Sequence, residues 1–248
     1  MWRSGFDARH ENVKPTPETT SFDALRDAIL RGMAHALSNR VAALGGINGL
    51  VDPGQVWTER LSKALHDEAR RLEDILRMMR LLPDDGRGEA GGIELQALVP
   101  DVIALHAYQS ALLQVECTAA YDRETMPVFA NRPRLVHALL LAIDSAKRYA
   151  HARGGRVSVS YGGDADRVTI RVSSEPSPAS GTPLGAAFDD IAARIAATGS
   201  ALRAAIAAVG GPPDVTVSSD GGELRVELTV PTLAAGRRGE LAARPTTA

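Results

Sequence analysis

The chain carries the stretch GMAHALSNRV at residues 32–41, and this stretch decides how the N-terminal part of the molecule folds. On a helix that turns about 100° per residue, the apolar side chains in and after the stretch share one direction. These residues are Met33, Leu37, Val41, Leu44 and Val51. His35 points roughly 160° away from them, and Asn39 lies one turn further along the same strip. The stretch therefore predicts an amphipathic helix that exposes a histidine and an asparagine together.

Two helices are expected in residues 21–85. Apolar positions recur every three or four residues from 21 to about 50, which indicates one long helix. The turn signal Asp52-Pro53-Gly54 follows, and a second periodic run extends from 56 to about 82. Each helix of such a hairpin buries only one stripe, so we expect two copies to pair into a dimeric four-helix bundle.

A second domain, which makes the chain α+β in class, is expected at residues 93–232. A glycine-rich linker at 86–92 separates this domain from the hairpin. The predicted strands lie at 93–95, 115–119, 156–161, 167–172, 215–217 and 224–228, and the predicted helices at 99–113, 134–150 and 186–209. The sequence thus predicts helices packed on a mixed sheet. Residues 1–20 and 233–248 lack periodicity and are expected to be disordered.

Composition excludes several classes of protein. The formal net charge is −2 and the basic residues form no evident stripe, so neither a nucleic acid nor a membrane surface is expected as a partner. The single cysteine, Cys117, rules out an internal disulfide and a multi-cysteine zinc site. No run approaches the roughly 20 apolar residues of a membrane span, and the N-terminus does not read as a signal peptide. A cytoplasmic location is therefore expected.

Four blocks, in this order, resemble the catalytic half of bacterial sensor histidine kinases. They are residues 68–72 (EARRL), 93–102 (IELQALVPDV), 131–140 (NRPRLVHALL), and Gly210-Gly211 with the hairpin and Pro231 that follow. The resemblance covers most of residues 21–231. It implies that the hairpin is the dimerisation and histidine-bearing module, and that the second domain is an α/β sandwich with the ATP-binding (Bergerat) fold of these kinases. It also places His35 at the phosphorylated histidine and Asn39 at the polar residue one turn later.

The sequence departs from this family at the positions that handle the nucleotide. Residues 140–149 read LLAIDSAKRY, with Leu141 and Ser145 where the family carries asparagines for magnesium and phosphate. Leucine cannot ligate a hard cation, and serine is a shorter and weaker oxygen donor, which leaves Asp144 as a substitute ligand. Residues 173–178 (SSEPSP) stand where the family reads adenine with an aspartate. We therefore expect neither ATP nor another cofactor to bind.

The chain is expected to combine an exposed histidine on a dimeric bundle with a kinase-like domain that lacks the nucleotide-binding residues of a kinase. This combination resembles the ChpT-like bacterial histidine phosphotransferases. This resemblance implies that His35 takes a phosphoryl group from the aspartate of one receiver domain and passes it to another, within a two-component phosphorelay. The partners are then response-regulator receiver domains, which supply their own Mg²⁺. Asn39 would hydrogen-bond the transferring oxygens or position a water molecule, and Ser38 and Arg40 would aid docking.

Three other functions stay open on the sequence. An ATP-dependent histidine kinase with unorthodox nucleotide boxes is one, although Ala36 stands where such a kinase usually carries an acidic base. A non-catalytic scaffold or pseudokinase would tolerate the loss of His35, and a receiver phosphatase would depend more on Asn39. His66, which precedes Asp67, is the rival histidine, but an ordinary solvated helix face explains it.

Overall fold

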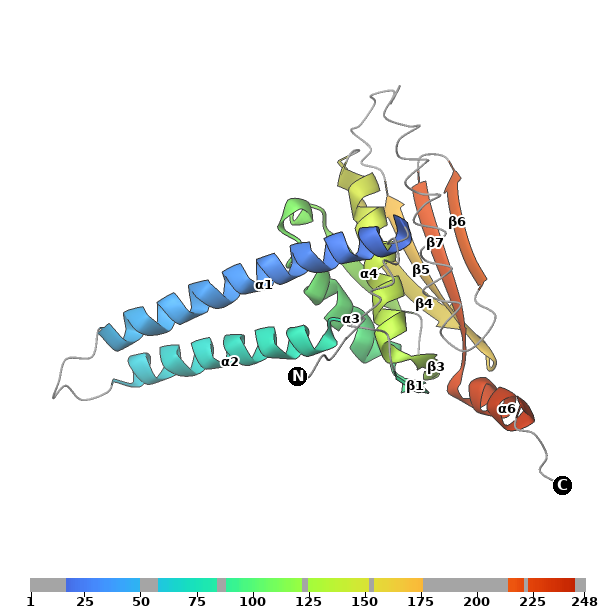
Figure 1. The fold of residues 1–248 in the computed structure, drawn as a ribbon, viewed down its shortest axis with the longest axis horizontal. Coiled ribbons are helices and arrows are strands. Elements are labelled where there is room, and N and C mark those ends of the chain that lie inside the picture. The colour runs from blue at the N-terminus through green and yellow to red at the C-terminus, as the bar shows by residue number, and fades with distance from the viewer. Residues whose placement is uncertain are drawn as a thin grey trace, which may run out of the picture.

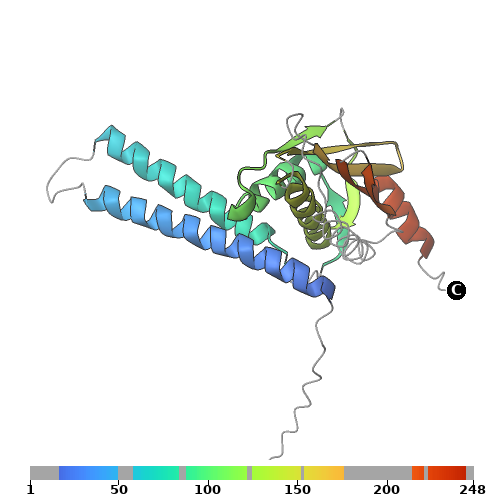
Figure 2. The same cartoon turned by 90° about the horizontal axis from the view of Figure 1, so that it is seen from above.

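A long helical hairpin projects from a set of α/β layers (Figures 1 and 2). The structure is a computed structural model that describes residues 17–49, 58–83, 88–121, 125–151, 154–175, 214–220 and 223–243. The predicted turn at 52–54 and the predicted helix at 186–209 lie outside the described residues. Within them the chain is α+β, as predicted.

The hairpin consists of α1 (Pro17–Gly49) and α2 (Glu59–Leu81), which pack side by side. Thr58 caps α2, because its side-chain oxygen accepts a hydrogen bond from the Leu61 backbone N–H at 3.3 Å. Both predicted helices are present, with ends that differ by up to four residues.

Five strands form the main sheet in the order β2-β4-β5-β7-β6, with β2 parallel to β4 and the other neighbours antiparallel. The strands are β2 (Cys117–Tyr121), β4 (Arg156–Gly163), β5 (Arg167–Glu175), β6 (Asp214–Asp220) and β7 (Glu223–Pro231). A second, two-stranded sheet pairs β1 (Ala90–Ile93) with β3 (Val128–Asn131). Both predicted β-hairpins are thus confirmed.

Helix α4 (Arg132–His151) lies between the main sheet and the first half of α1. The inward residues of the strands alternate with polar outward ones, as a half-buried sheet requires. The inward set is Val157, Val159, Tyr161, Val168, Ile170, Val172, Val226, Leu228 and Val230, all at most 3% exposed. Because α4 is covered on both sides, its apolar residues are buried around most of its circumference. One continuous core therefore joins the sheet, α4 and α1.

Helix α3 (Leu95–His106) corrects the prediction of a strand at 93–95 and a helix at 99–113. The strand β1 ends at Ile93, and the helix begins at Leu95 and includes Pro100. Its apolar residues Leu95, Leu98, Val99, Val102 and Leu105 are all buried on one side. Their burial outweighs the backbone hydrogen bond that Pro100 cannot donate, since that residue lies on the exposed side.

The linker predicted at 86–92 and the tail predicted at 233–248 both contain regular structure. Gly91 and Gly92 belong to β1, and Gly92 packs against Leu233. Helix α6 (Leu233–Ala243) occupies much of the expected tail. It forms because the Thr232 side chain caps the Ala235 N–H at 3.3 Å and Gly236 packs on Phe129.

The expected lead-in at 1–20 is helical from Pro17 onward, since α1 begins there. Proline suits the first position of a helix, where its missing N–H has no partner to lose. Strand β3 and the three-residue helix η1 (Ser110–Leu112) were not predicted. The boundaries between the hairpin module and the α/β module stay a prediction.

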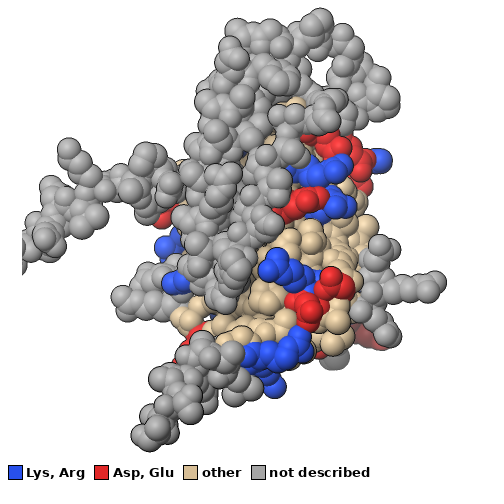
Figure 3. Space-filling view, turned by 90° about the vertical axis from the view of Figure 1, so that its right-hand side faces the viewer, with Lys and Arg blue, Asp and Glu red and all other residues tan. Residues whose placement is uncertain are grey.

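Basic and acidic side chains alternate on the face shown in Figure 3. Ion pairs on β5, β7 and α6 include Arg171–Glu227 at 2.7 Å, Arg225–Glu223 at 3.2 Å, and Arg238 with Asp166. The described part of this face therefore carries no broad field of one sign. None of the described helices has the length and apolar character needed to cross a bilayer.

Candidate functional site

His35 and Asn39 are both exposed on α1, as their spacing predicts. Ser38 is exposed too, and its hydroxyl donates to the Ala34 carbonyl at 2.9 Å within the same helix. Arg31, one turn before His35, extends the strip and was missed by the sequence reasoning. Its spacing of four residues was the available signal. The strip thus presents an imidazole between a guanidinium and an amide, groups that suit a phosphoryl group.

Arg40, which the sequence predicted to aid docking, forms an ion pair within the hairpin. Its guanidinium lies 3.3 Å from both carboxylate oxygens of Glu68 on α2, and Arg71 pairs with the same carboxylate. Glu68 is only 7% exposed. Burial by itself raises the pKa of Glu68, but the hydrogen bonds and charges of the two arginines outweigh it and lower that pKa. Arg40 therefore acts first as a cross-link between α1 and α2.

The apolar stripe predicted on α1 divides into two parts. Met33 is 1% exposed, with Leu25 and Ile29 below it equally buried against the α/β layers. Val41, in contrast, is 59% exposed. Its half of the helix projects beyond those layers (Figure 2), so the stripe is covered near the N-terminus of α1 and open further along.

The turn after α3 touches α1 immediately before His35. A Cβ added at Gly32 would overlap the Tyr108 carbonyl oxygen, so this glycine permits a close approach of two backbones. Residues 110–112 also contact α1. Nearer the start of α1, the ring of Phe22 stacks on His137 of α4 at a centroid distance of 3.5 Å.

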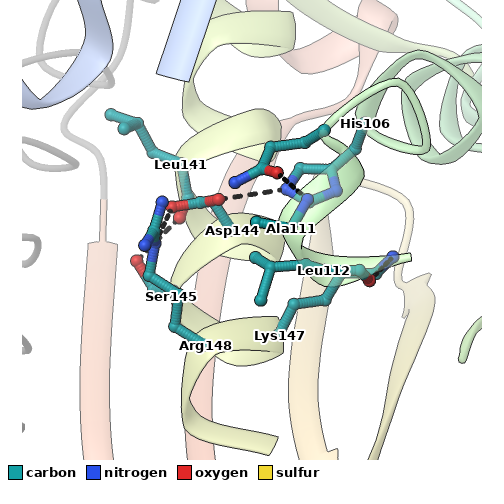
Figure 4. Close-up of polar contacts among 9 residues, drawn as sticks. His106, Ala111, Leu112, Leu141, Asp144, Ser145, Lys147 and Arg148 are labelled. Carbon is teal, nitrogen blue, oxygen red and sulfur yellow. Dashed lines mark hydrogen bonds and ion pairs between the residues drawn. The ribbon is translucent and has the colours of Figure 1, made fainter. Parts of the chain in front are cut away.

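Residues 140–149, where the resemblance to histidine kinases predicted the nucleotide ligands, lie on α4, and the polar side chains of Asp144 and Ser145 are engaged within the chain (Figure 4). Asp144 lies 3.3 Å from the Nε2 atom of His106 through one oxygen and accepts a hydrogen bond from Arg148 Nε at 2.6 Å through the other. Ser145 donates to the Leu141 carbonyl at 2.8 Å, and the Leu141 side chain is 3% exposed.

These contacts decide the electrostatics of Asp144. Burial alone raises the pKa of its carboxyl group, but the hydrogen bonds and charges of His106 and Arg148 outweigh burial and hold that pKa below its ordinary value. Among the described residues, no cluster of three or more His, Cys, Asp or Glu could hold a metal ion. The pairing of Asp144 with His106, 38 residues earlier, has no signal in the sequence.

The segment predicted to replace the adenine-reading motif begins inside β5. Ser173 and Ser174 are 7% and 1% exposed, and Ser174 accepts a hydrogen bond from the Leu224 N–H at 2.8 Å. Residues 176–178 lie outside the described part of the chain, as do the glycines at 181 and 185 that the sequence reasoning considered.

The remaining histidines take different environments. His66 is exposed on α2 and His151 is exposed at the end of α4. His106 is fully buried, while His137 is half-buried, and burial lowers the pKa of its ring to about 4. His10 lies outside the described residues. His35 and His66 are thus the two exposed histidines that the hairpin offers.

No protein-family model matches this sequence, and no curated protein does either. Among solved structures the chain is similar to the histidine kinase AdeS of Acinetobacter baumannii, with 21% identity over 82% of this chain and 96% of that chain, at a TM-score of 0.43. A histidine kinase from Burkholderia phymatum STM815 shows 16% identity over 88% and 99%, at a TM-score of 0.42. The histidine kinase ThkA, solved in complex with the response regulator protein TrrA, shows 13% identity over 87% and 64%, at a TM-score of 0.41. At this level of likeness, the function of this chain has to be argued from its own residues.

Proposed function

We propose that this chain is a histidine phosphotransferase of a two-component phosphorelay, similar in kind to the ChpT-like proteins. His35 shuttles a phosphoryl group between the aspartates of response-regulator receiver domains, and the chain neither binds nor needs ATP. The receiver domains supply Mg²⁺ from their own sites, and the chain acts as a homodimer. The observation that carries the proposal is the exposed His35–Asn39 strip on a chain whose nucleotide box is occupied by its own contacts.

The transfer step needs only a nucleophile and a docking surface from this chain. A neutral imidazole nitrogen of His35 attacks the phosphorus of an aspartyl phosphate. The new P–N bond forms as the P–O bond to the aspartate breaks, and the carboxylate leaves with the bonding electrons. The ring then loses the proton of its other nitrogen to solvent. Transfer to a second receiver runs the same step in reverse, with the second aspartate as the nucleophile.

Neighbouring side chains have defined tasks in this proposal. Asn39 donates a hydrogen bond to the oxygens of the phosphoryl group, and Arg31 lies where it adds a positive charge to them. Ser38 and Arg40 border the docking surface, with Arg40 contributing through the stiffness that its pairing with Glu68 gives the hairpin.

The side-chain contacts of α4 favour this function over that of an ATP-dependent kinase. A kinase needs ligands for magnesium and phosphate at Leu141, Asp144 or Ser145. The first side chain is apolar, the second has both oxygens engaged, and the third donates to its own helix. A receiver phosphatase remains the second candidate, because Asn39 is exposed beside His35 and could orient water.

Phosphoryl transfer to His35 can be measured directly. A panel of purified receiver domains is radiolabelled on the aspartate and mixed with the chain, and acid-labile label on the chain is followed with time. We expect the wild type to accept label from at least one receiver and His35→Ala to accept none. The substitution should change stability by no more than about 0.5 kcal/mol, because the side chain is exposed.

His66→Ala is the matched control, since it removes the other exposed histidine of the hairpin. Transfer that survives His35→Ala but not His66→Ala would move the site to α2. Receivers that lose phosphate without labelling the chain, in a manner that needs Asn39 and not His35, would establish the phosphatase instead.

A further inference from the structure

The turn between α3 and β2, residues 107–114, lies beside the histidine strip on α1. Gly32 of α1, which the Tyr108 carbonyl approaches, precedes His35 by three residues. This separation is about 4.5 Å along the helix axis and about 60° around it. The turn and His35 therefore border the same region of surface, although more than 70 residues separate them in sequence.

A protein partner centred on His35 has a footprint that extends to this turn. Each side of a specific protein complex contributes about 800 Å², a disc of about 16 Å radius. A receiver domain centred on the His35 imidazole extends that far in every direction along the surface. The α3–β2 turn falls inside this disc because its contact with α1 is only one helical turn away.

The exposed residues of the turn between 107 and 114 carry no charge. They are Ala107, Ser110, Ala111, Leu113 and Gln114, and the first exposed charge of the connection is Glu116, next to β2. Leu113 is 60% exposed, so the described part of the chain leaves most of its side chain uncovered. Depletion of charge around an exposed large aliphatic side chain is typical of the centre of a protein interface.

The turn is also fixed by contacts with α4 and by contacts within the turn itself. His106, at the end of α3, is bound to Asp144 of α4, and Lys147 Nζ lies 3.5 Å from the Leu112 carbonyl oxygen. Gln109 is 4% exposed and accepts the Ala111 N–H at 2.8 Å. Gln114 contacts His151 at 3.1 Å. A surface that is preformed in this way loses little conformational entropy when a partner binds.

We propose that the α3–β2 turn, centred on Leu113, is the second half of the docking surface for the receiver domain that exchanges its phosphoryl group with His35. The surface binds an uncharged, apolar patch that flanks the phosphorylated aspartate of the receiver. This inference rests on the proposed phosphotransfer. It assigns the α/β module a role in binding the partner, which is separate from any nucleotide chemistry.

Leu113→Asp tests the surface with the full chain. The receiver that labels the wild type fastest is used, and the initial rate is measured against receiver concentration. We expect the concentration for half-maximal transfer to rise at least tenfold, while the maximal rate stays within twofold. Met126→Asp is the matched control, because Met126 is 50% exposed and follows the far end of β2. It should leave both quantities unchanged.

Phosphoramidate, a small phosphoryl donor, separates docking from folding and from the nucleophile. It should label His35 equally in the wild type and in Leu113→Asp, because a small donor needs no docking surface. If Leu113→Asp loses this labelling, Ser110→Arg at another exposed position of the turn replaces it in the same assay. The inference is overturned if substitutions in the turn leave the half-maximal concentration within twofold of the wild type while His35→Ala abolishes transfer. The proposed function itself fails if no receiver of the panel labels the wild type.

Discussion

Asp144 is the residue of α4 whose contacts bear most directly on magnesium binding. Its carboxylate could replace a missing asparagine as a magnesium ligand only by giving up or sharing the contacts that hold it within the chain. Both oxygens are engaged, by His106 and Arg148, and the lowered pKa keeps the group ionised and paired. Releasing it would leave the Nε2 atom of His106 buried without its partner, a loss of about 1–3 kcal/mol for an unsatisfied buried polar group.

We therefore expect Mg-ATP to show no saturable binding to the chain at micromolar nucleotide. Leu141 and Ser145 offer no free ligand beside Asp144, so the helix lacks the oxygen donors that a hard cation requires. Isothermal titration calorimetry measures this, with a nucleotide-binding histidine kinase domain titrated in the same buffer as the control. Saturable heat in the micromolar range would reinstate the ATP-dependent kinase.

At the scale of the element, α1 is one helix with two different surroundings. Its first half is buried on α4, with Phe22 stacked on His137, and α2 runs alongside its second half. The junction fixes the direction in which the hairpin projects, and hence where His35 lies relative to the α3–β2 turn.

The stability of this junction should depend on pH through His137. Burial lowers the pKa of its ring to about 4 in the folded chain, whereas an unfolded histidine has a pKa near 6.5. Between these values the unfolded chain binds a proton that the folded chain does not, so stability falls as the pH drops from 6.5 towards 4. His137→Gln should reduce the loss of unfolding free energy between pH 7.5 and pH 5 by about 1 kcal/mol, after allowance for the partial exposure of the ring.

Urea unfolding at the two pH values measures this difference. His66→Gln serves as the control, because that histidine is exposed on α2 and its removal should leave the pH dependence unchanged. An equal effect of the two substitutions would contradict the assignment to the α1–α4 junction.

At the scale of the whole molecule, the hairpin leaves one apolar face uncovered. Four of the seven exposed large hydrophobic residues of the described chain lie on it, namely Val41, Leu65, Leu76 and Met79. On each helix these positions lie to the same rotational side of the buried positions. In an antiparallel pair this places both sets on one side of the hairpin, where a second copy would complete a four-helix bundle.

We expect the chain to be a dimer in solution and the double substitution Leu65→Glu with Leu76→Glu to make it a monomer. Four like charges per dimer would then face each other in an apolar interface, which is strongly unfavourable. Both side chains are 40% exposed or more in the single chain, so the monomer should keep its fold. Multi-angle light scattering gives the masses, and Leu113→Asp should remain a dimer. A monomeric wild type would contradict the bundle.

The sequence by itself determined the features that depend on local periodicity. The spacing of Met33, Leu37 and Val41 was enough to predict the helix and the exposed side of His35, because a side chain's direction on a helix depends only on its position. The alternation in 156–161 and 167–172 likewise predicted the antiparallel pair β4 and β5. The role of His35 itself stays a prediction until transfer is measured.

Only the tertiary structure decided what depends on partners distant in sequence. Gly91 and Gly92 form a strand because β3, about 40 residues later, pairs with them, and α6 forms where Leu233 meets the Pro127 carbonyl at 2.7 Å. The engagement of Asp144 by His106, and the approach of Tyr108 to Gly32, follow the same rule. Burial and hydrogen bonding between remote segments outweigh local propensity, and no window of neighbouring residues contains that information.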